Sequence, residues 1–391
     1  MDTKLIKIED RMNIRDEELL EAAQVIRDGG LVAFPTETVY GLGANALDEE
    51  AAKKIYAAKG RPSDNPLIAH ISCMEELEPL VAEIPETGRK LAEAFWPGPL
   101  TLVFPKSQRV PYGTTGGLET VAVRMPSDPA ASRLIALAGV PIAAPSANTS
   151  GRPSPTTAEH VWQDMNGKIE MILDGGPVGI GVESTIVDVS GEIPTLLRPG
   201  AVTIEMLREL LGNVEIDPAI LGPLHEDVKP KAPGMKYRHY APKAQLLLVE
   251  LEDKGAGDEE AGREVSGEAG KVVDGESGKV VSGELSIESA DNQRRVAEKI
   301  MELAREKMAA GYRVGIICTD ESRDYYTEGI VRSLGLRARE ETIAHNLFAV
   351  LREYDDLEVD YIFSESFSKE ALGQAIMNRL TKAAGYRIIT V

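Results

Sequence analysis

Two cations one residue apart, Lys59 and Arg61, stand in a run rich in proline and polar side chains, with Asn65 close behind them. Earlier in the chain, the segment 34–45 (FPTETVYGLGAN) places hydroxyls, a carboxylate and glycines directly after an apolar run. A hydrophobic core requires none of these polar groups, so their density predicts a small-molecule site that accepts an anion. The structural alternative is that cations near a helix C-terminus only complement the helix dipole.

Other polar side chains lie within or just after apolar, strand-like runs. His70 lies in one such run, where a histidine is more often a packed core residue than a ligand. Arg124 lies in another, and a buried cation is unfavourable unless an anion such as a substrate carboxylate pairs with it. Ser146 and Asn148 follow a further strand, and ligands collect at strand ends in α/β sheets. Although Ser146 could be an ordinary turn hydroxyl, the nearby Ser154 favours contacts to nucleotide phosphates.

The elements that must position these residues alternate between strands and helices over the first half of the chain. Apolar periodicity predicts strands at 31–34, 67–71, 100–104, 121–125, 140–144, 171–173 and 185–189, and helices at 19–26, 49–58, 129–138, 158–165 and 203–211. Asp48 is a typical N-cap for the helix at 49–58. The pattern indicates a mixed α/β domain with a twisted sheet, and we place its end at residue 212.

A smaller α/β unit is predicted over 244–391, after a proline-rich linker at 213–243. Its expected strands are 245–251, 313–318, 361–363 and 387–391, and its expected helices are 293–310, 343–354 and 370–384. This order suggests a small Rossmann-like sheet. Within it, 252–291 holds eight glycines and two near-repeats, so we expect a mobile insertion or an irregular hairpin there.

Composition excludes several classes of protein. The 391 residues carry a net charge of −20, of which 252–291 contributes −8 through twelve acidic and four basic residues. Such a balance disfavours a broad nucleic-acid-binding surface. No apolar run is long enough to span a membrane and no signal peptide begins the sequence. Two distant cysteines, Cys73 and Cys318, suggest reduced thiols and a cytoplasmic location. We find neither a His/Cys metal cluster nor a nucleophile elbow.

Seven segments together carry a resemblance to a known family. They are 34–45, 59–66, 95–101, 120–124, 144–151, 181–185 and 197–200. On these the chain resembles the long form of threonylcarbamoyl-AMP synthase, which has a YrdC-type domain followed by a Rossmann-like domain. The segment 373–380 (GQAIMNRL) is similar to that second domain. Matches spread over about half of the chain are far more specific than a single motif.

The resemblance implies a reaction and a set of roles. Threonylcarbamoyl-AMP and pyrophosphate would form from L-threonine, bicarbonate or CO2, and ATP with Mg²⁺, and Lys59 and Arg61 would be catalytic through charge stabilisation. The residues expected to bind the nucleotide are Lys59, Arg61, Asn65, Thr120, Ser146, Asn148, Ser154, Arg198 and one of Tyr237 and Tyr240. Those expected to bind threonine are Thr38, His70, Arg124, Ala144 and Ser184. The linker 213–243 would fold over the site as a lid.

The product would pass to a complex that modifies the adenosine next to the tRNA anticodon. Two other functions remain open. One is an RNA-binding YrdC-type module without synthase activity, which the charge disfavours and which a salt-dependent gel shift would reveal. The other is a carbamoyltransferase related to hydrogenase-maturation enzymes. Those enzymes add zinc-finger-like cysteine clusters and an acylphosphatase-like domain, and this sequence has neither.

Overall fold

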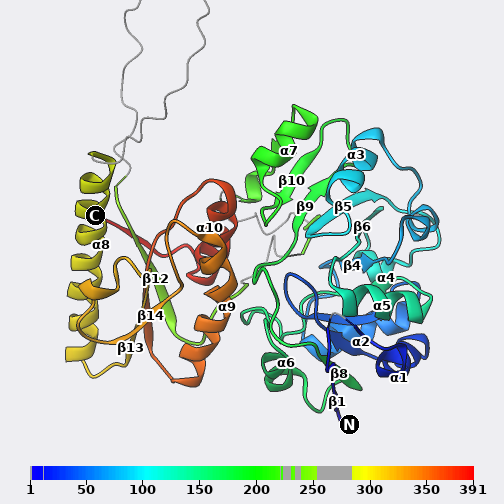
Figure 1. Cartoon of the computed structure of the whole chain (residues 1–391), viewed down its shortest axis with the longest axis horizontal. Helices are drawn as coiled ribbons and strands as arrows, with labels where there is room; N and C mark the ends of the chain where they lie inside the picture. Colours follow the sequence, from blue (N-terminus) through cyan, green and yellow to red (C-terminus); the bar gives the residue numbers. More distant parts are fainter. Residues whose placement is uncertain (1, 12, 221, 223–229, 234–238, 253–283) are drawn as a thin grey trace, which may run out of the picture.

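The computed structural model of the chain describes residues 2–11, 13–220, 222, 230–233, 239–252 and 284–391. Two α/β units lie side by side, the larger coloured blue to green and the smaller mostly yellow to red (Figure 1). We call them the N-terminal unit, up to residue 220, and the C-terminal unit, from residue 244. In the described ranges, no helix combines the length and the apolar character needed to cross a membrane.

The N-terminal unit is built on one mixed sheet of eleven strands, in the order β1-β8-β2-β3-β7-β4-β6-β5-β9-β10-β11. The strands are β1 (Lys4–Lys7), β2 (Val32–Phe34), β3 (Gly41–Asn45), β4 (Ile68–His70), β5 (Leu100–Pro105), β6 (Thr120–Arg124), β7 (Ile142–Ala143), β8 (Met171–Asp174), β9 (Thr185–Asp188), β10 (Thr195–Arg198) and β11 (Glu215–Ile216). Its central strands β4 and β6 run parallel, with His70 and Arg124 as register partners. Residues far apart in sequence are therefore neighbours at one edge of these strands.

Helices pack on both faces of this sheet, because successive side chains of its strands point to opposite faces and both faces are apolar. They are α1 (Asp16–Arg27), α2 (Glu49–Lys59), α3 (Glu86–Phe95), α4 (Tyr112–Thr115), α5 (Pro129–Ala138), α6 (Ala158–Met165) and α7 (Ile204–Leu211), with the 3₁₀ turns η1 (Met74–Glu76), η2 (Glu78–Leu80) and η3 (Pro218–Ile220). In β2, Val32 and Phe34 join the cluster formed by α1 and α5, whereas Ala33 joins the cluster on the other face. The core is thus split into two layers by the sheet.

The C-terminal unit is a five-stranded parallel sheet in the order β14-β13-β15-β12-β16. Its elements are β12 (Gln245–Glu250), α8 (Glu284–Ala309), β13 (Val314–Cys318), η4 (Arg323–Tyr325), β14 (Ile330–Ser333), α9 (Glu340–Asp356), β15 (Tyr361–Glu365), α10 (Ala371–Ala383) and β16 (Ile388–Thr390). The helix α8 covers one face, whereas α9 and α10 cover the face toward the N-terminal unit (Figure 1).

The two units share a hydrophobic cluster. Val39 and Val182 of the N-terminal unit pack with residues of α9 and α10 such as Phe348. At Gly181, which has a φ of +93°, an added Cβ would lie only 2.4 Å from the carbonyl oxygen of Ala344 on α9. This position therefore tolerates only glycine, and the helix approaches the loop at backbone distance.

The predicted α/β class is confirmed, and several details of the sequence reading are corrected. The segment 41–45, for which we predicted no strand, forms β3 and pairs with β2 and β7. The predicted linker at 213–243 contains β11, which extends the first sheet by pairing with β10. The helix predicted at 293–310 begins earlier than expected, because α8 starts at Glu284, inside the range 252–291 that we assigned to an insertion. Residues 253–283 lie outside the described residues.

Candidate active site

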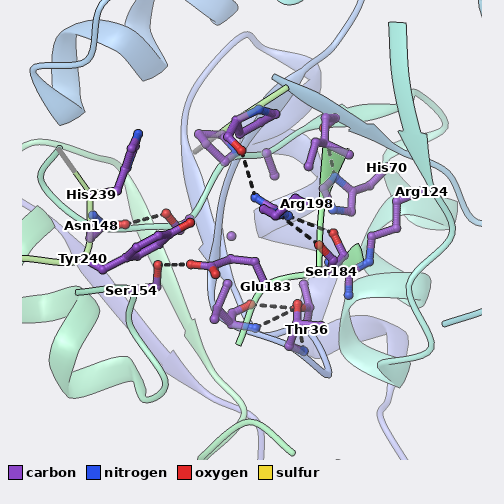
Figure 2. A pocket seen from close by; sticks show the side chains of 18 of the residues that line it. Thr36, His70, Arg124, Asn148, Ser154, Glu183, Ser184, Arg198, His239 and Tyr240 are labelled. Atoms are coloured by element: carbon purple, nitrogen blue, oxygen red, sulfur yellow. Dashed lines mark hydrogen bonds between the residues drawn. The ribbon is translucent and has the colours of Figure 1, made fainter. Parts of the chain in front are cut away.

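A pocket lies at the ends of the central strands of the N-terminal unit, beside Tyr240 and His239 from the segment before the second unit (Figure 2). Most of the predicted site residues line it: Thr38, Arg61, His70, Arg124, Ala144, Ser146, Asn148, Ser154, Ser184, Arg198 and Tyr240. Lys59, Asn65 and Thr120 are not among its lining residues, and Tyr237 lies outside the described residues. Six of the seven sequence segments thus contribute residues to one cavity, and the exception is 95–101.

Local structure explains why Lys59 and Arg61 lie together. The helix α2 begins where the Asp48 carboxylate accepts hydrogen bonds from the amides of Glu50 and Ala51. It ends at Gly60, whose φ of +61° places it in the left-handed region that stops helices. Lys59 is therefore the last residue of the helix, and Arg61 follows the turn. Both side chains are buried, so they do not merely complement the helix dipole at the surface.

Lys59 lies behind the pocket rather than on its wall. Its Nζ donates hydrogen bonds to the carbonyl oxygens of Ser146 and Asn148, the latter at 2.6 Å. Burial and the nearby Arg61 lower the pKa of Lys59 far below its ordinary value. In this arrangement, Lys59 fixes the loop that carries Ser146 and Asn148.

Arg61 lines the pocket and also holds the chain that follows it. Its Nη2 donates to the carbonyl oxygen of Pro66 at 3.1 Å and, at 3.4 Å, to that of Asn65. The side-chain Oδ1 of Asn65 is buried and accepts no hydrogen bond from the described residues. Thr120 is the first residue of β6 and Arg124 is the last, so the two side chains lie at opposite ends of that strand.

His70 is neutral at physiological pH. Burial lowers the pKa of the His70 ring to about 3, and the charge of Arg124 acts in the same direction. Its Nδ1 lies 3.0 Å from the carbonyl oxygen of Ile68 and 3.3 Å from that of Ile142. A carbonyl only accepts, so Nδ1 carries the proton and Nε2 is left as an acceptor.

From the sequence we expected a buried Arg124 to pair with an anion such as a substrate carboxylate, and the protein itself supplies one anion. The Nη2 of Arg124 lies 2.8 Å from Oε1 of Glu37, in the first motif. Burial would raise the pKa of Glu37, but the interaction with Arg124 and backbone hydrogen bonds together outweigh burial, and the pKa is lowered. Arg124 is buried and lines the pocket, while its charge is paired with Glu37.

Arg198 is held by neutral groups. Its Nε donates to the carbonyl oxygen of Ser184 at 3.0 Å, and its Nη2 donates to the Ser184 hydroxyl at 3.1 Å. Another nitrogen, Nη1, lies 3.4 Å from the carbonyl oxygen of Pro233. Burial lowers the pKa of Arg198 to about 10, so the group stays charged at neutral pH. The hydroxyls of Ser184 and Thr101 lie 2.8 Å apart and complete this corner.

Sequence reasoning missed three groups that shape the pocket. Thr36 fixes the first loop, because its hydroxyl donates to the carbonyl oxygen of Val39 at 2.6 Å. Glu37 pairs with Arg124, as described above. Glu183 lines the pocket and accepts a hydrogen bond from Ser154, which Figure 2 shows as a dashed line. All three stand inside motifs quoted from the sequence, but residue type alone did not indicate their partners.

Fold and site together define a class of protein. A mixed α/β unit with a pocket rich in buried arginines and hydroxyls is joined to a parallel α/β unit that packs beside the pocket. Such a site suits an anionic, phosphate-bearing ligand and an activation step that relies on positioning and charge.

Comparisons with known proteins agree with this class. Residues 24–200 match the Sua5–yciO–yrdC family, described as telomere recombination, and residues 202–385 match the threonylcarbamoyl-AMP synthase C-terminal domain. The chain is 48% identical to threonylcarbamoyl-AMP synthase of Pyrococcus abyssi, with 100% of both chains covered. It is 44% identical to that of Bacillus subtilis, with 98% of both covered. The chain belongs to the threonylcarbamoyl-AMP synthase family.

A solved structure extends this likeness to three dimensions. The crystal structure of Pyrococcus abyssi Sua5 complexed with L-threonine matches with a TM-score of 0.84 and 46% identity, and 100% of both chains is covered. The relatives therefore contain both units, and the predicted long-form family is confirmed.

Proposed function

We propose that this chain synthesises threonylcarbamoyl-AMP and pyrophosphate in the pocket, from L-threonine, bicarbonate or CO2, and ATP. The amine of threonine and CO2 form a carbamate. A carbamate oxygen then attacks the α-phosphorus of ATP, and pyrophosphate leaves. The observation that supports the proposal best is that Arg61, Arg124 and Arg198 are all buried and line one cavity, in a chain that belongs to this family.

The threonine end of the pocket is assigned to the paired strands β4 and β6. The guanidinium of Arg124 would bind the carboxylate, since it is buried and lines the cavity. The Nε2 acceptor of neutral His70 would bind the threonine hydroxyl or its amine. Thr38, Ala144 and Ser184 line the same cavity and would complete the shell. Hydroxyl and backbone groups of this kind orient a small zwitterion without adding charge.

The nucleotide end is assigned to Arg61 and Arg198 together with the loop that carries Ser146, Asn148 and Ser154. Cations fixed before the substrate arrives stabilise the charge that develops as pyrophosphate leaves. Arg198 is suited to this role because its hydrogen bonds to Ser184 and Pro233 leave its charge uncompensated by them.

Three further residues are assigned to the nucleotide end, although they do not line the pocket: Lys59, Asn65 and Thr120. Lys59 would act first by shaping the loop at Ser146 and Asn148, and an arriving phosphate would raise its pKa again. The buried Oδ1 of Asn65 faces no donor among the described residues, which suits a ligand hydroxyl or amine. Thr120 would contact the nucleotide.

Mg²⁺ is proposed to enter with ATP. Of the carboxylates at the pocket, Glu37 is engaged by Arg124 and Glu183 by Arg379. In the part of the chain that the structure describes, no three His, Cys, Asp or Glu side chains converge as a metal centre. The donor set does not fit an ion held by the protein, so phosphate oxygens and water would be its ligands.

Tyr240 and His239 are proposed to form a lid. Tyr240 is buried and lines the pocket, and its φ of +64° is unusual for an aromatic residue. Its ring stacks on Phe348 with centroids 5.3 Å apart. A lid that excludes water would protect the carbamoyl-adenylate from hydrolysis. Tyr237 remains the alternative nucleotide contact.

The remaining roles follow from the product. A reactive acyl-adenylate would be transferred to tRNA by a separate complex in the cytoplasm, since the acidic charge of −20 disfavours stable RNA binding by this chain. A gel shift at physiological salt tests that point. Strong RNA binding with a steep salt dependence would instead favour the RNA-binding alternative.

The decisive experiment is mass-spectrometric detection of threonylcarbamoyl-AMP after incubation of the full chain with ATP, bicarbonate and threonine. The product should be absent when threonine is omitted and reduced when carbonate is removed from the buffer. Arg61→Ala in the same assay is the variant control. Absence of product from the native chain would refute the proposed function.

A further inference from the structure

One buried cation of the C-terminal unit reaches across to the pocket. Arg379 lies in α10, within the segment 373–380 that the sequence singled out, and its side chain is fully buried. Its Nε donates to Oε2 of Glu183 at 2.9 Å. Its Nη1 donates to the carbonyl oxygen of Pro199, also at 2.9 Å. Both partners belong to the N-terminal unit, so the contact is made entirely across the interface.

Glu183 connects this arginine to the predicted nucleotide site. One of its carboxylate oxygens binds Arg379, whereas the other accepts a hydrogen bond from the hydroxyl of Ser154. Glu183 and Ser154 both line the pocket. The carboxylate therefore fixes the orientation of a hydroxyl that faces the ligand, and Arg379 fixes the carboxylate.

The same guanidinium contacts the proposed lid. The Cζ of Arg379 lies 5.6 Å from the centre of the Tyr240 ring, within the range of a cation–π contact. Phe348 stacks against this ring as well. Arg379 thus stands between Glu183 and Tyr240, and its loss would disturb both.

The charge of Glu183 explains why Arg379 is needed at this position. A carboxylate beside a triphosphate site opposes binding unless a cation neutralises it. Arg198 is the pocket cation whose charge also acts on Glu183, and the attraction of Arg379 and Arg198 keeps the pKa of Glu183 low despite its burial. With Arg379 in place, the hydrogen bonds that Arg198 donates to the described residues go to neutral groups of Ser184 and Pro233. Without Arg379, Glu183 would compete with the phosphates for Arg198.

We propose that Arg379 is a positioning residue of the active site, through which the C-terminal unit neutralises and orients Glu183 and so keeps Arg198 available for ATP. The inference rests on the proposed function of the pocket. It gives the second unit a part in nucleotide binding in addition to stabilising the fold.

The test measures ATP and threonine binding separately, by calorimetry on the full chain. Arg379→Gln removes the charge and should weaken ATP binding about tenfold while changing threonine affinity by less than about threefold. When Arg379→Gln is made in a chain that already carries Glu183→Gln, ATP affinity should fall by less than about threefold, because no carboxylate is left to neutralise. Arg379→Lys keeps the charge and should recover most of the affinity.

The matched control is Arg337→Gln, which breaks another arginine–glutamate pair of the C-terminal unit, with Glu365. It should leave ATP binding unchanged. Equal loss of ATP and threonine affinity in Arg379→Gln, or an equal loss in the two backgrounds, would overturn the proposal. If Arg379→Gln does not fold, a tenfold loss of ATP affinity in Arg379→Lys would overturn it. Product formation by the native chain is assayed in parallel, so a failure of the proposed function is seen separately.

Discussion

Replacing Arg124 by alanine should have two separable effects, because this residue faces both a ligand site and a protein carboxylate. Its Nη2 lies 2.8 Å from Glu37, and the two side chains are 5% and 14% exposed. The substitution removes the expected partner of the threonine carboxylate. It also leaves Glu37 buried without its counter-charge.

The magnitudes follow from this geometry. Removing one member of a buried ion pair costs about 3–5 kcal/mol of unfolding free energy, and we expect the lower end because Glu37 is partly exposed and can take up a proton. Loss of a charge-assisted contact to the ligand carboxylate should weaken threonine binding by about 2 kcal/mol or more, roughly 30-fold. ATP affinity in the absence of threonine should change little.

The sign of the pH dependence checks the first effect. In the native chain the pKa of Glu37 is lowered, so the pair stabilises the fold above the ordinary carboxyl pKa, and this contribution is lost only as pH falls through the lowered value. In Arg124→Ala, burial is expected to raise that pKa instead. The folded variant then binds a proton that it loses as pH rises. The difference in unfolding free energy between the native chain and Arg124→Ala should therefore widen from pH 5 to pH 8.

The double variant Arg124→Ala, Glu37→Gln separates stability from binding. With no buried charge left, it should unfold at a higher temperature than the single variant, yet bind threonine equally poorly. Calorimetric titration with threonine and with ATP, together with thermal unfolding, measures all of these quantities. If threonine binds the stable double variant as tightly as the native chain, the assignment of Arg124 to the substrate is wrong.

Three further predictions concern other parts of the chain. Arg61→Ala and Lys59→Ala should each weaken ATP binding or turnover by about 2–4 kcal/mol, and Lys59→Ala should do so through the loop that Lys59 holds. Full activity in both variants would show that the two cations only complement the helix dipole. Deleting 253–283 and joining its ends by a short turn should leave turnover near normal, because loop length alone changes stability little; inactivity of a folded deletion would refute this. Adding ATP and threonine together should slow proteolysis within 229–242, and Tyr240→Ala should make less product or lose it faster to water. Unchanged protection and full activity would remove the lid.

Elements with a complete local signal were predicted well. The helix α5 matches its expected bounds because Asp128 caps it, Pro129 begins it and Gly139 ends it in the left-handed region. The strand β3 was missed because Gly41 and Gly43 resemble a loop. Packing requires glycine at Gly43, since a Cβ there would lie 2.7 Å from the Phe34 ring. The residues next to Gly43 in the sequence do not predict its contact with Phe34.

The site divides in the same way. Most of the predicted site residues do line the pocket, because they stand in dense polar motifs such as the one that holds Arg61. Their partners could not be predicted. Glu183 and Arg379 are 196 residues apart, and only the docking of two separately folded units brings them together. The pairing of Arg124 with Glu37 likewise depends on how the β2–β3 turn lies across β6.

The close approach at Gly181 restricts how the two units can change over evolutionary time. The nearest atoms that a side chain there would meet are the carbonyl oxygen of Ala344 and the Cα of His345, at 2.4 and 2.5 Å. These are backbone atoms, which every amino acid carries, so no second substitution in α9 could make room for it. The clash caused by a mutation at Gly181 can be relieved only if the whole helix α9 moves. Phe348, which stacks against the ring of Tyr240, would then move with the helix. No single substitution elsewhere in the chain can therefore compensate for a mutation of Gly181.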